Sequence, residues 1–159
     1  MEIELKKIKI VDEMSDETTC FCADVWIDGA YVGSAENAGS GGPNLYRPHG
    51  LEDVLQKRAE SLGPVEFNGT WLERDADMVV SELLEAHRLR KELRRRLVFV
   101  EKSSGKLRET KVFKAAVLAD LLKPENRELT KARLGGDVEK ILNLMPFECA
   151  LKLWNGGEG

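Results

Sequence analysis

The sequence predicts an α+β fold, with an antiparallel N-terminal β-meander packed on a long central helix, then a basic β-hairpin and short C-terminal helices. In the helical segment, Asp75–Arg96, the apolar residues recur at helical spacing, with no Gly or Pro. The segments before it alternate apolar and polar residues and end in turn signals. Strands and helices are also segregated along the chain, which argues against alternating βαβ units. We expect a single domain over 1–155, made of 1–73, 74–113 and 114–155, and a frayed tail at 156–159.

The first strands are predicted from alternation and from one turn. Ile3–Ile10 alternates apolar and charged residues with one slip, which is typical of a β-bulge. In Thr18–Ile27 one face is apolar, formed by Phe21, Ala23, Val25 and Ile27. Asp28-Gly29 then suits a type I′ turn into Ala30–Ala35, because both central residues of that turn need positive φ.

The remaining elements follow from helical periodicity and from Gly and Pro boundaries. Leu51–Leu62 is predicted as a helix, and Val65–Leu72 as a short hairpin around Asn68-Gly69. Leu97–Phe113 is predicted as a basic hairpin. The C-terminal part is predicted to hold four helices, over Ala115–Lys123, Glu125–Leu134, Val138–Leu144 and Phe147–Trp154. We expect the tryptophans to fill the core, at Trp26, Trp71 and Trp154.

Between the meander and the first helix, Asn37–Gly50 has no periodicity and is rich in glycine. Glycines let backbone N–H groups approach a phosphate or a carboxylate, so the segment is a candidate anion site. It is neither a P-loop nor a dinucleotide fingerprint, since no Gly-Lys-Ser/Thr follows and no G-x-G-x-x-G opens a helix. The alternative is an ordinary surface loop. The candidate residues are Gly39, Ser40, Gly41, Gly42, Asn44, Tyr46, Arg47 and His49.

Two arginines fall on the apolar stripe of the long helix. At 100° per residue, Arg90 and Arg94 lie within the stripe, and His87 lies beside it. A buried arginine must be paired or must bind an anion. His87, Arg90 and Arg94 therefore join the candidate anion site, for instance for a nucleotide. The alternative is that the helix leaves the core after Leu89, and the arginines snorkel or pair with acidic residues of the meander.

Charge is distributed unevenly along the chain, whose net charge is −4. Met1–Asn37 has nine acidic residues against three lysines, whereas Ala86–Val117 has eleven basic residues against three acidic ones. Either these two regions pair in the fold, or the basic segment meets an acidic partner such as nucleic acid. Without exposed aromatic residues nearby, we expect only sequence-blind phosphate contacts. The candidate surface comprises Arg88, Lys91, Arg95, Lys102, Lys106, Arg108, Lys111 and Lys114.

The cysteines and histidines form no pattern that indicates catalysis or metal binding. Cys20, Cys22 and Cys149 include no C-x-x-C, and nothing singles out a Cys–His pair. We therefore expect no metal, no cofactor and no enzymatic activity. An odd number of cysteines in a chain that begins with a strand pattern favours reduced thiols in a cytoplasm. No apolar run approaches the roughly 18 residues of a membrane span.

Several features together resemble a known group of proteins. They are the Thr-Thr-Cys-Phe strand at Thr18–Phe21, the Asp-Gly hairpin, Gly41-Gly42, the basic helix-to-strand junction at Arg94–Phe99 and the segment Ile141–Leu144. In these the chain resembles small uncharacterised proteins of phages and plasmids. The resemblance implies a mobile-element origin and a counter-defence or other accessory role, but no activity or functional residue. From it and the charges we expect a protein that binds a host protein or complex, or else nucleic acid, and no membrane.

Overall fold

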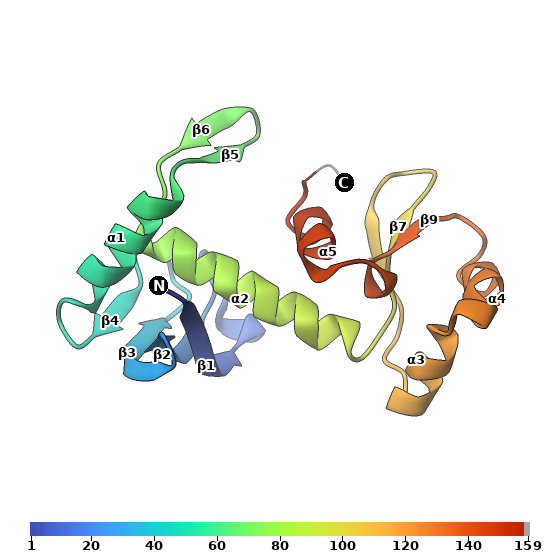
Figure 1. Ribbon diagram of the computed structural model, residues 1–159, viewed down its shortest axis with the longest axis horizontal. Coiled ribbons are helices and arrows are strands. Elements are labelled where there is room, and N and C mark those ends of the chain that lie inside the picture. The colour runs from blue at the N-terminus through green and yellow to red at the C-terminus, as the bar shows by residue number, and fades with distance from the viewer. Residues whose placement is uncertain (158–159) are drawn as a thin grey trace. The chain divides into compact units, whose positions relative to one another are not determined.

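The structure is a computed structural model, and it describes residues 1–157 (Figure 1). The chain forms two compact units, Met1–Leu84 and Glu85–Gly159, here called unit 1 and unit 2 and described separately. One helix, α2 (Ala76–Leu93), contributes residues to both. The predicted α+β fold is confirmed, with an antiparallel meander, a long central helix, hairpins and short C-terminal helices. The single domain stays a prediction.

Unit 1 contains a four-stranded antiparallel sheet in the order β1-β2-β3-β4. Its strands are β1 (Ile3–Ile10), β2 (Phe21–Ile27), β3 (Ala30–Asn37) and β4 (Leu45–Arg47), with a short 3₁₀ helix, η1, over Asp12–Met14. The predicted bulge is present as a register shift between Lys6 and Lys9. The Asp28-Gly29 turn has φ values of 49° and 80°, as the predicted type I′ turn requires.

The core of unit 1 lies between one face of the sheet and two helices, α1 (Leu51–Leu62) and the first part of α2. The predicted inward residues of β2 form that face: Phe21, Ala23 and Val25 are buried, and Ile27 packs at the edge. Against them pack Leu51, Leu55, Ala76, Val80 and Leu84. Alternation along β2 thus identified the buried face correctly.

A separate two-stranded sheet follows α1, formed by β5 (Val65–Phe67) and β6 (Thr70–Leu72). Asn68 and Gly69 form its turn with positive φ, as predicted. The prediction that Trp71 fills the core is wrong, because its side chain is 67% exposed. The two three-residue strands pair only with each other, and all three residues of β6 are exposed. Trp26 and Trp154 are partly buried.

Unit 2 contains a three-stranded antiparallel sheet in the order β8-β7-β9. Its strands are β7 (Val98–Glu101), β8 (Leu107–Glu109) and β9 (Val138–Ile141), and β7 and β8 form the predicted basic hairpin. Around them lie short helices: α3 (Ala115–Leu121), η2 (Pro124–Asn126), α4 (Arg127–Arg133), η3 (Leu142–Leu144) and α5 (Phe147–Trp154).

The predicted helix over Val138–Leu144 is wrong, since its first part is the strand β9. Val138 and Ile141 are both buried, a spacing that suits one face of a helix. Pairing decides the outcome, because Ile141 lies opposite Phe99 on β7 and a register shift brings Val138 to the same side. Among the described residues, no helix is long and apolar enough to cross a membrane.

Candidate functional site

The glycine-rich loop is organised around one buried side chain, Asn37, which is 7% exposed. Its Oδ1 accepts hydrogen bonds from Thr18 Oγ1 at 2.7 Å and from Gly39 N at 2.8 Å. Its Nδ2 donates to Gly42 O at 3.2 Å and to Asn44 Oδ1 at 3.0 Å. Asn37 thereby uses both donors and its acceptor, and it ties the loop to the segment between η1 and β2 through Thr18.

The loop also holds an anion of the chain itself, the carboxylate of Asp77 in the first turn of α2. Asn44 N donates to Asp77 Oδ2 at 3.1 Å, and the Tyr46 hydroxyl donates to Asp77 Oδ1 at 2.6 Å. Burial, and then the hydrogen bond to Asp77, raises the pKa of Tyr46, so the phenol stays protonated and keeps donating. We expected Asn44 to contact a bound phosphate. In the structure its backbone N–H donates instead to the carboxylate of Asp77.

The other predicted loop residues divide into two groups. Gly39 is buried, and its carbonyl accepts hydrogen bonds from the backbone N–H groups of residues 16, 17 and 18, while Gly41 N donates to Thr18 Oγ1 at 3.2 Å. Arg47 is exposed and pairs with Glu36 at 3.4 Å, and Ser40 and His49 are exposed as well. The structure thus gathers the glycines with Asn44 and Tyr46, but it does not bring Arg47 or His49 into that network.

A cavity of about 310 Å³ opens beside this loop. Its polar wall carries Asn37, Asn44, Thr18 and two carboxylates, Glu17 and Asp77, and no Lys, Arg or His lines it. Carboxylates repel the phosphate that the glycines were expected to receive. Anion binding by the loop stays a prediction, and the charge of this cavity does not favour it.

The premise that Arg90 and Arg94 lie on a buried stripe is wrong, since both side chains are exposed. The residues that α2 buries change along its length: Ala76, Val79, Val80 and Leu84 within unit 1, and Ala86 and Leu89 within unit 2. At 100° per residue, the second set does not continue the stripe of the first. Extrapolating one stripe along the whole helix therefore misplaced both arginines.

In unit 2 the three helix residues of the predicted anion site have surroundings of their own. The Arg90 guanidinium lies over the Phe147 ring, 4.3 Å from its centroid, as in a cation–π interaction. Desolvation, followed by the charges of Lys91, Arg90 and Arg94, lowers the pKa of His87. His87 is therefore a neutral side chain at pH 7, which adds no charge for an anion.

The predicted basic surface lies in unit 2, which carries seventeen basic and eleven acidic residues, a net charge of +6. Unit 1 has seven basic and seventeen acidic residues, a net charge of −10. Three predicted arginines have partners within unit 2: Arg88 with Glu85, Arg95 with Glu92, and Arg108 with Glu101. The five lysines of the predicted surface are exposed and have no ion pair within the described chain: Lys91, Lys102, Lys106, Lys111 and Lys114.

The sequence reasoning missed a third surface, the β5–β6 hairpin. Phe67 is 61% exposed, Trp71 67% and Leu72 41%. Phe67 pairs with Thr70 and Glu66 pairs with Trp71, so the two aromatic rings occupy opposite faces of the hairpin. The exposure of these residues could have been predicted from the Asn68-Gly69 turn. It joins two very short strands, and a hairpin of that size is too small to bury an aromatic side chain.

Among residues 1–157, no group of three His, Cys, Asp or Glu side chains could hold a metal ion. Cys20 is buried in unit 1, while Cys22 and Cys149 are exposed thiols. Comparison with protein-family models, with curated proteins and with solved structures finds no match.

Proposed function

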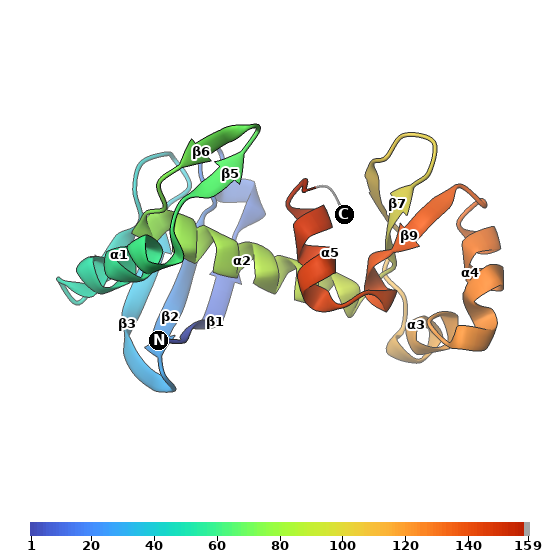
Figure 2. The ribbon, with the colours of Figure 1, turned by 45° about the horizontal axis from the view of Figure 1, so that its top comes forward.

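We propose that this is a non-enzymatic binding protein that engages another protein through the β5–β6 hairpin. The observation that carries the proposal is the exposure of Phe67 and Trp71 on so small an element, at 61% and 67%. Tryptophan is among the residues most enriched at binding hot spots, and exposed aromatic side chains bury a large apolar area when a partner covers them. The hairpin extends beyond α1 in both ribbon views (Figure 2), and residues on both of its faces are exposed.

The hairpin also indicates the chemistry of the partner. Its two rings lie on opposite faces, which suits a groove better than a flat surface. Glu66 and Glu73 are exposed and have no ion pair within the described chain. The complementary partner is a protein groove with an apolar floor and a rim of Lys or Arg, since opposite charges steer and align an interface. With the origin that the resemblance implies, that partner is a host protein, and the role an accessory or counter-defence one.

Replacing Trp71 by serine is expected to weaken partner binding about 30-fold, which corresponds to about 2 kcal/mol for a hot-spot aromatic. A pull-down from host lysate identifies proteins retained by the wild type and lost with the variant. Titration of the purified partner then measures the ratio of Kd values. Because Trp71 is 67% exposed, the far-UV CD spectrum and Tm of the variant should match the wild type.

Tyr31→Ser is the matched control, since Tyr31 is an aromatic residue 57% exposed on β3 of the same unit. It should retain the partner. If Trp71→Ser and Tyr31→Ser both retained every protein that the wild type retains, the proposal would be contradicted. If analytical ultracentrifugation showed a dimer that Trp71→Ser abolishes, the partner of the hairpin would be a second copy of this chain and not a host protein.

A second candidate function, binding to nucleic acid, is favoured by the five unpaired lysines of the predicted basic surface in unit 2. Three of them, Lys102, Lys106 and Lys111, lie in or beside the β7–β8 hairpin, where they are exposed. Lysines without aromatic neighbours contact phosphates but do not read bases. The proposed mode is therefore sequence-independent.

Binding to random duplex DNA is expected to weaken with salt, with a negative slope of log K against log salt. Replacing Lys102, Lys106 and Lys111 with alanine should make that slope less negative by about 3, because each lost phosphate contact removes about 0.9. Fluorescence anisotropy at several salt concentrations measures this slope. The double variant Lys9→Ala/Lys57→Ala, with exposed lysines of unit 1, is the control and should keep the wild-type slope. Absence of binding at low salt, or equal slopes for all three proteins, rejects this candidate.

A further inference from the structure

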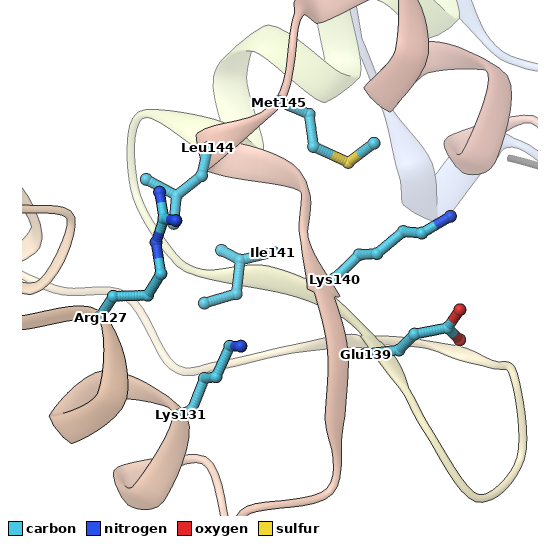
Figure 3. Close-up of a pocket in the computed structure, with 7 residues that line it drawn as sticks. All are labelled: Arg127, Lys131, Glu139, Lys140, Ile141, Leu144 and Met145. Carbon is cyan, nitrogen blue, oxygen red and sulfur yellow. The ribbon is translucent and has the colours of Figure 1, made fainter. Parts of the chain in front are cut away.

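A second cavity, of about 210 Å³, lies within unit 2 between α4 and β9 (Figure 3). Arg127 and Lys131 approach it from α4, one helical turn apart and so on one face of that helix. Ile141 of β9 and Leu144 of η3 form an apolar wall facing these cations. The cavity therefore combines two positive charges with an apolar surface.

The elements that carry these residues are anchored independently of the cavity. On α4, Thr130 is 1% exposed, and its Oγ1 donates to Leu121 O at 2.7 Å. On the other side, β9 is fixed by pairing with β7, where Ile141 lies opposite Phe99. The two walls are thus part of the folded core of unit 2, and a ligand would find them already formed.

The two cations are poorly compensated. Lys131 Nζ lies 3.9 Å from Glu128 Oε1, but that carboxylate is 88% exposed, so the pair is weak. Arg127 has no ion pair within the described part of the chain. Glu139 and Lys140 also line the cavity with opposite charges, and their side chains point away from Arg127 and Lys131 (Figure 3). A net positive charge is left facing the cavity.

We infer that this cavity binds an organic phosphate monoester, with its phosphate between Arg127 and Lys131 and its apolar part on Ile141 and Leu144. A guanidinium presents a planar fork that binds two phosphate oxygens, and an ammonium adds a point charge. The dianion matches two cations, whereas a carboxylate would match only one of them. The apolar wall favours an ester over inorganic phosphate, because only the ester covers that wall.

Phenyl phosphate, inorganic phosphate and benzoate are suitable probes, titrated into the full chain at low ionic strength by calorimetry. Phenyl phosphate should bind about tenfold more tightly than inorganic phosphate, as expected from covering roughly 60 Å² of apolar surface. Benzoate should bind more weakly than phenyl phosphate. Equal affinities for phenyl phosphate and inorganic phosphate, or a preference for benzoate, would overturn the inference.

Variants separate this site from general charge attraction. Arg127→Gln/Lys131→Gln should lower the affinity for phenyl phosphate and for inorganic phosphate at least tenfold. The control Lys123→Gln/Arg133→Gln makes the same charge change outside the cavity and should leave both affinities unchanged. Leu144→Ser should abolish the preference for the ester while keeping the affinity for inorganic phosphate, a result that misfolding would not produce. Equal losses in both double variants would contradict the site. Trp71→Ser should have no effect, so the site is tested independently of the hairpin.

Discussion

Replacing Gly39 by alanine is expected to lower the free energy of unfolding of unit 1 by roughly 3–4 kcal/mol. Gly39 has φ +86°, and a Cβ there would lie 2.0 Å from Met14 O and 2.8 Å from Cys20 Cβ. The loop would have to move away from the chain preceding β2. That movement would also break the hydrogen bond from Gly39 N to Asn37, at the centre of the loop network.

Gly42→Ala is a matched control, because Gly42 has nearly the same φ, +85°, but nothing within 4 Å of an added Cβ. It should cost only the conformational penalty of about 1–2 kcal/mol. Urea denaturation followed by CD measures both changes, and amide hydrogen exchange assigns the loss to unit 1. Equal costs for the two variants would show that the close approach to Met14 does not matter.

Replacing Asn143 by alanine is expected to lower the free energy of unfolding of unit 2 by about 3 kcal/mol. Its Nδ2 donates to Leu93 O at 3.0 Å and to Arg96 O at 2.9 Å, at the C-terminal end of α2. Its Oδ1 accepts from Val98 N at 2.9 Å, at the start of β7. Alanine would leave three half-buried backbone groups without these partners, each of which carries a desolvation cost.

Asn126→Ala provides the comparison, since Asn126 Nδ2 makes one exposed hydrogen bond to Asp120 O at 2.9 Å. It should cost less than about 1 kcal/mol. Urea denaturation measures both variants, and exchange of the Val98 amide should accelerate only in Asn143→Ala. A loss in Asn143→Ala as small as that of Asn126→Ala would rule out a junction role for Asn143.

The elements that could be predicted from the sequence are those decided by neighbouring residues. Asp28-Gly29 and Asn68-Gly69 form turns because two adjacent residues tolerate positive φ, and the slip in β1 is visible as two consecutive lysines. The strand β9 could not be predicted, because it depends on an edge of β7 about forty residues earlier. For the same reason the structural roles of Asn37 and Asn143 were not visible, as their partners lie up to 19 and 50 residues away.

The candidate site was harder to predict than the fold, because the electrostatic character of a site depends on which charges the fold brings together. Glycines indicated an anion at the loop, and an anion is there, but it is Asp77 from α2. The exposure of Trp71 also depended on whether another layer covers the hairpin. A site at Arg127 and Lys131 could not be predicted from the sequence, because nothing in a short basic helix indicates that Ile141 and Leu144 lie opposite it.

The division of α2 between the units bears on how the chain folds. Its 18 residues fall equally on either side of the boundary between Leu84 and Glu85. A helical segment of about nine residues is too short to persist in water by itself, since initiating a helix is unfavourable and isolated helices below about 12–15 residues are marginal. Each half of α2 therefore lengthens the other past that threshold, so the formation of one unit lowers the initiation cost for the other and links their folding transitions.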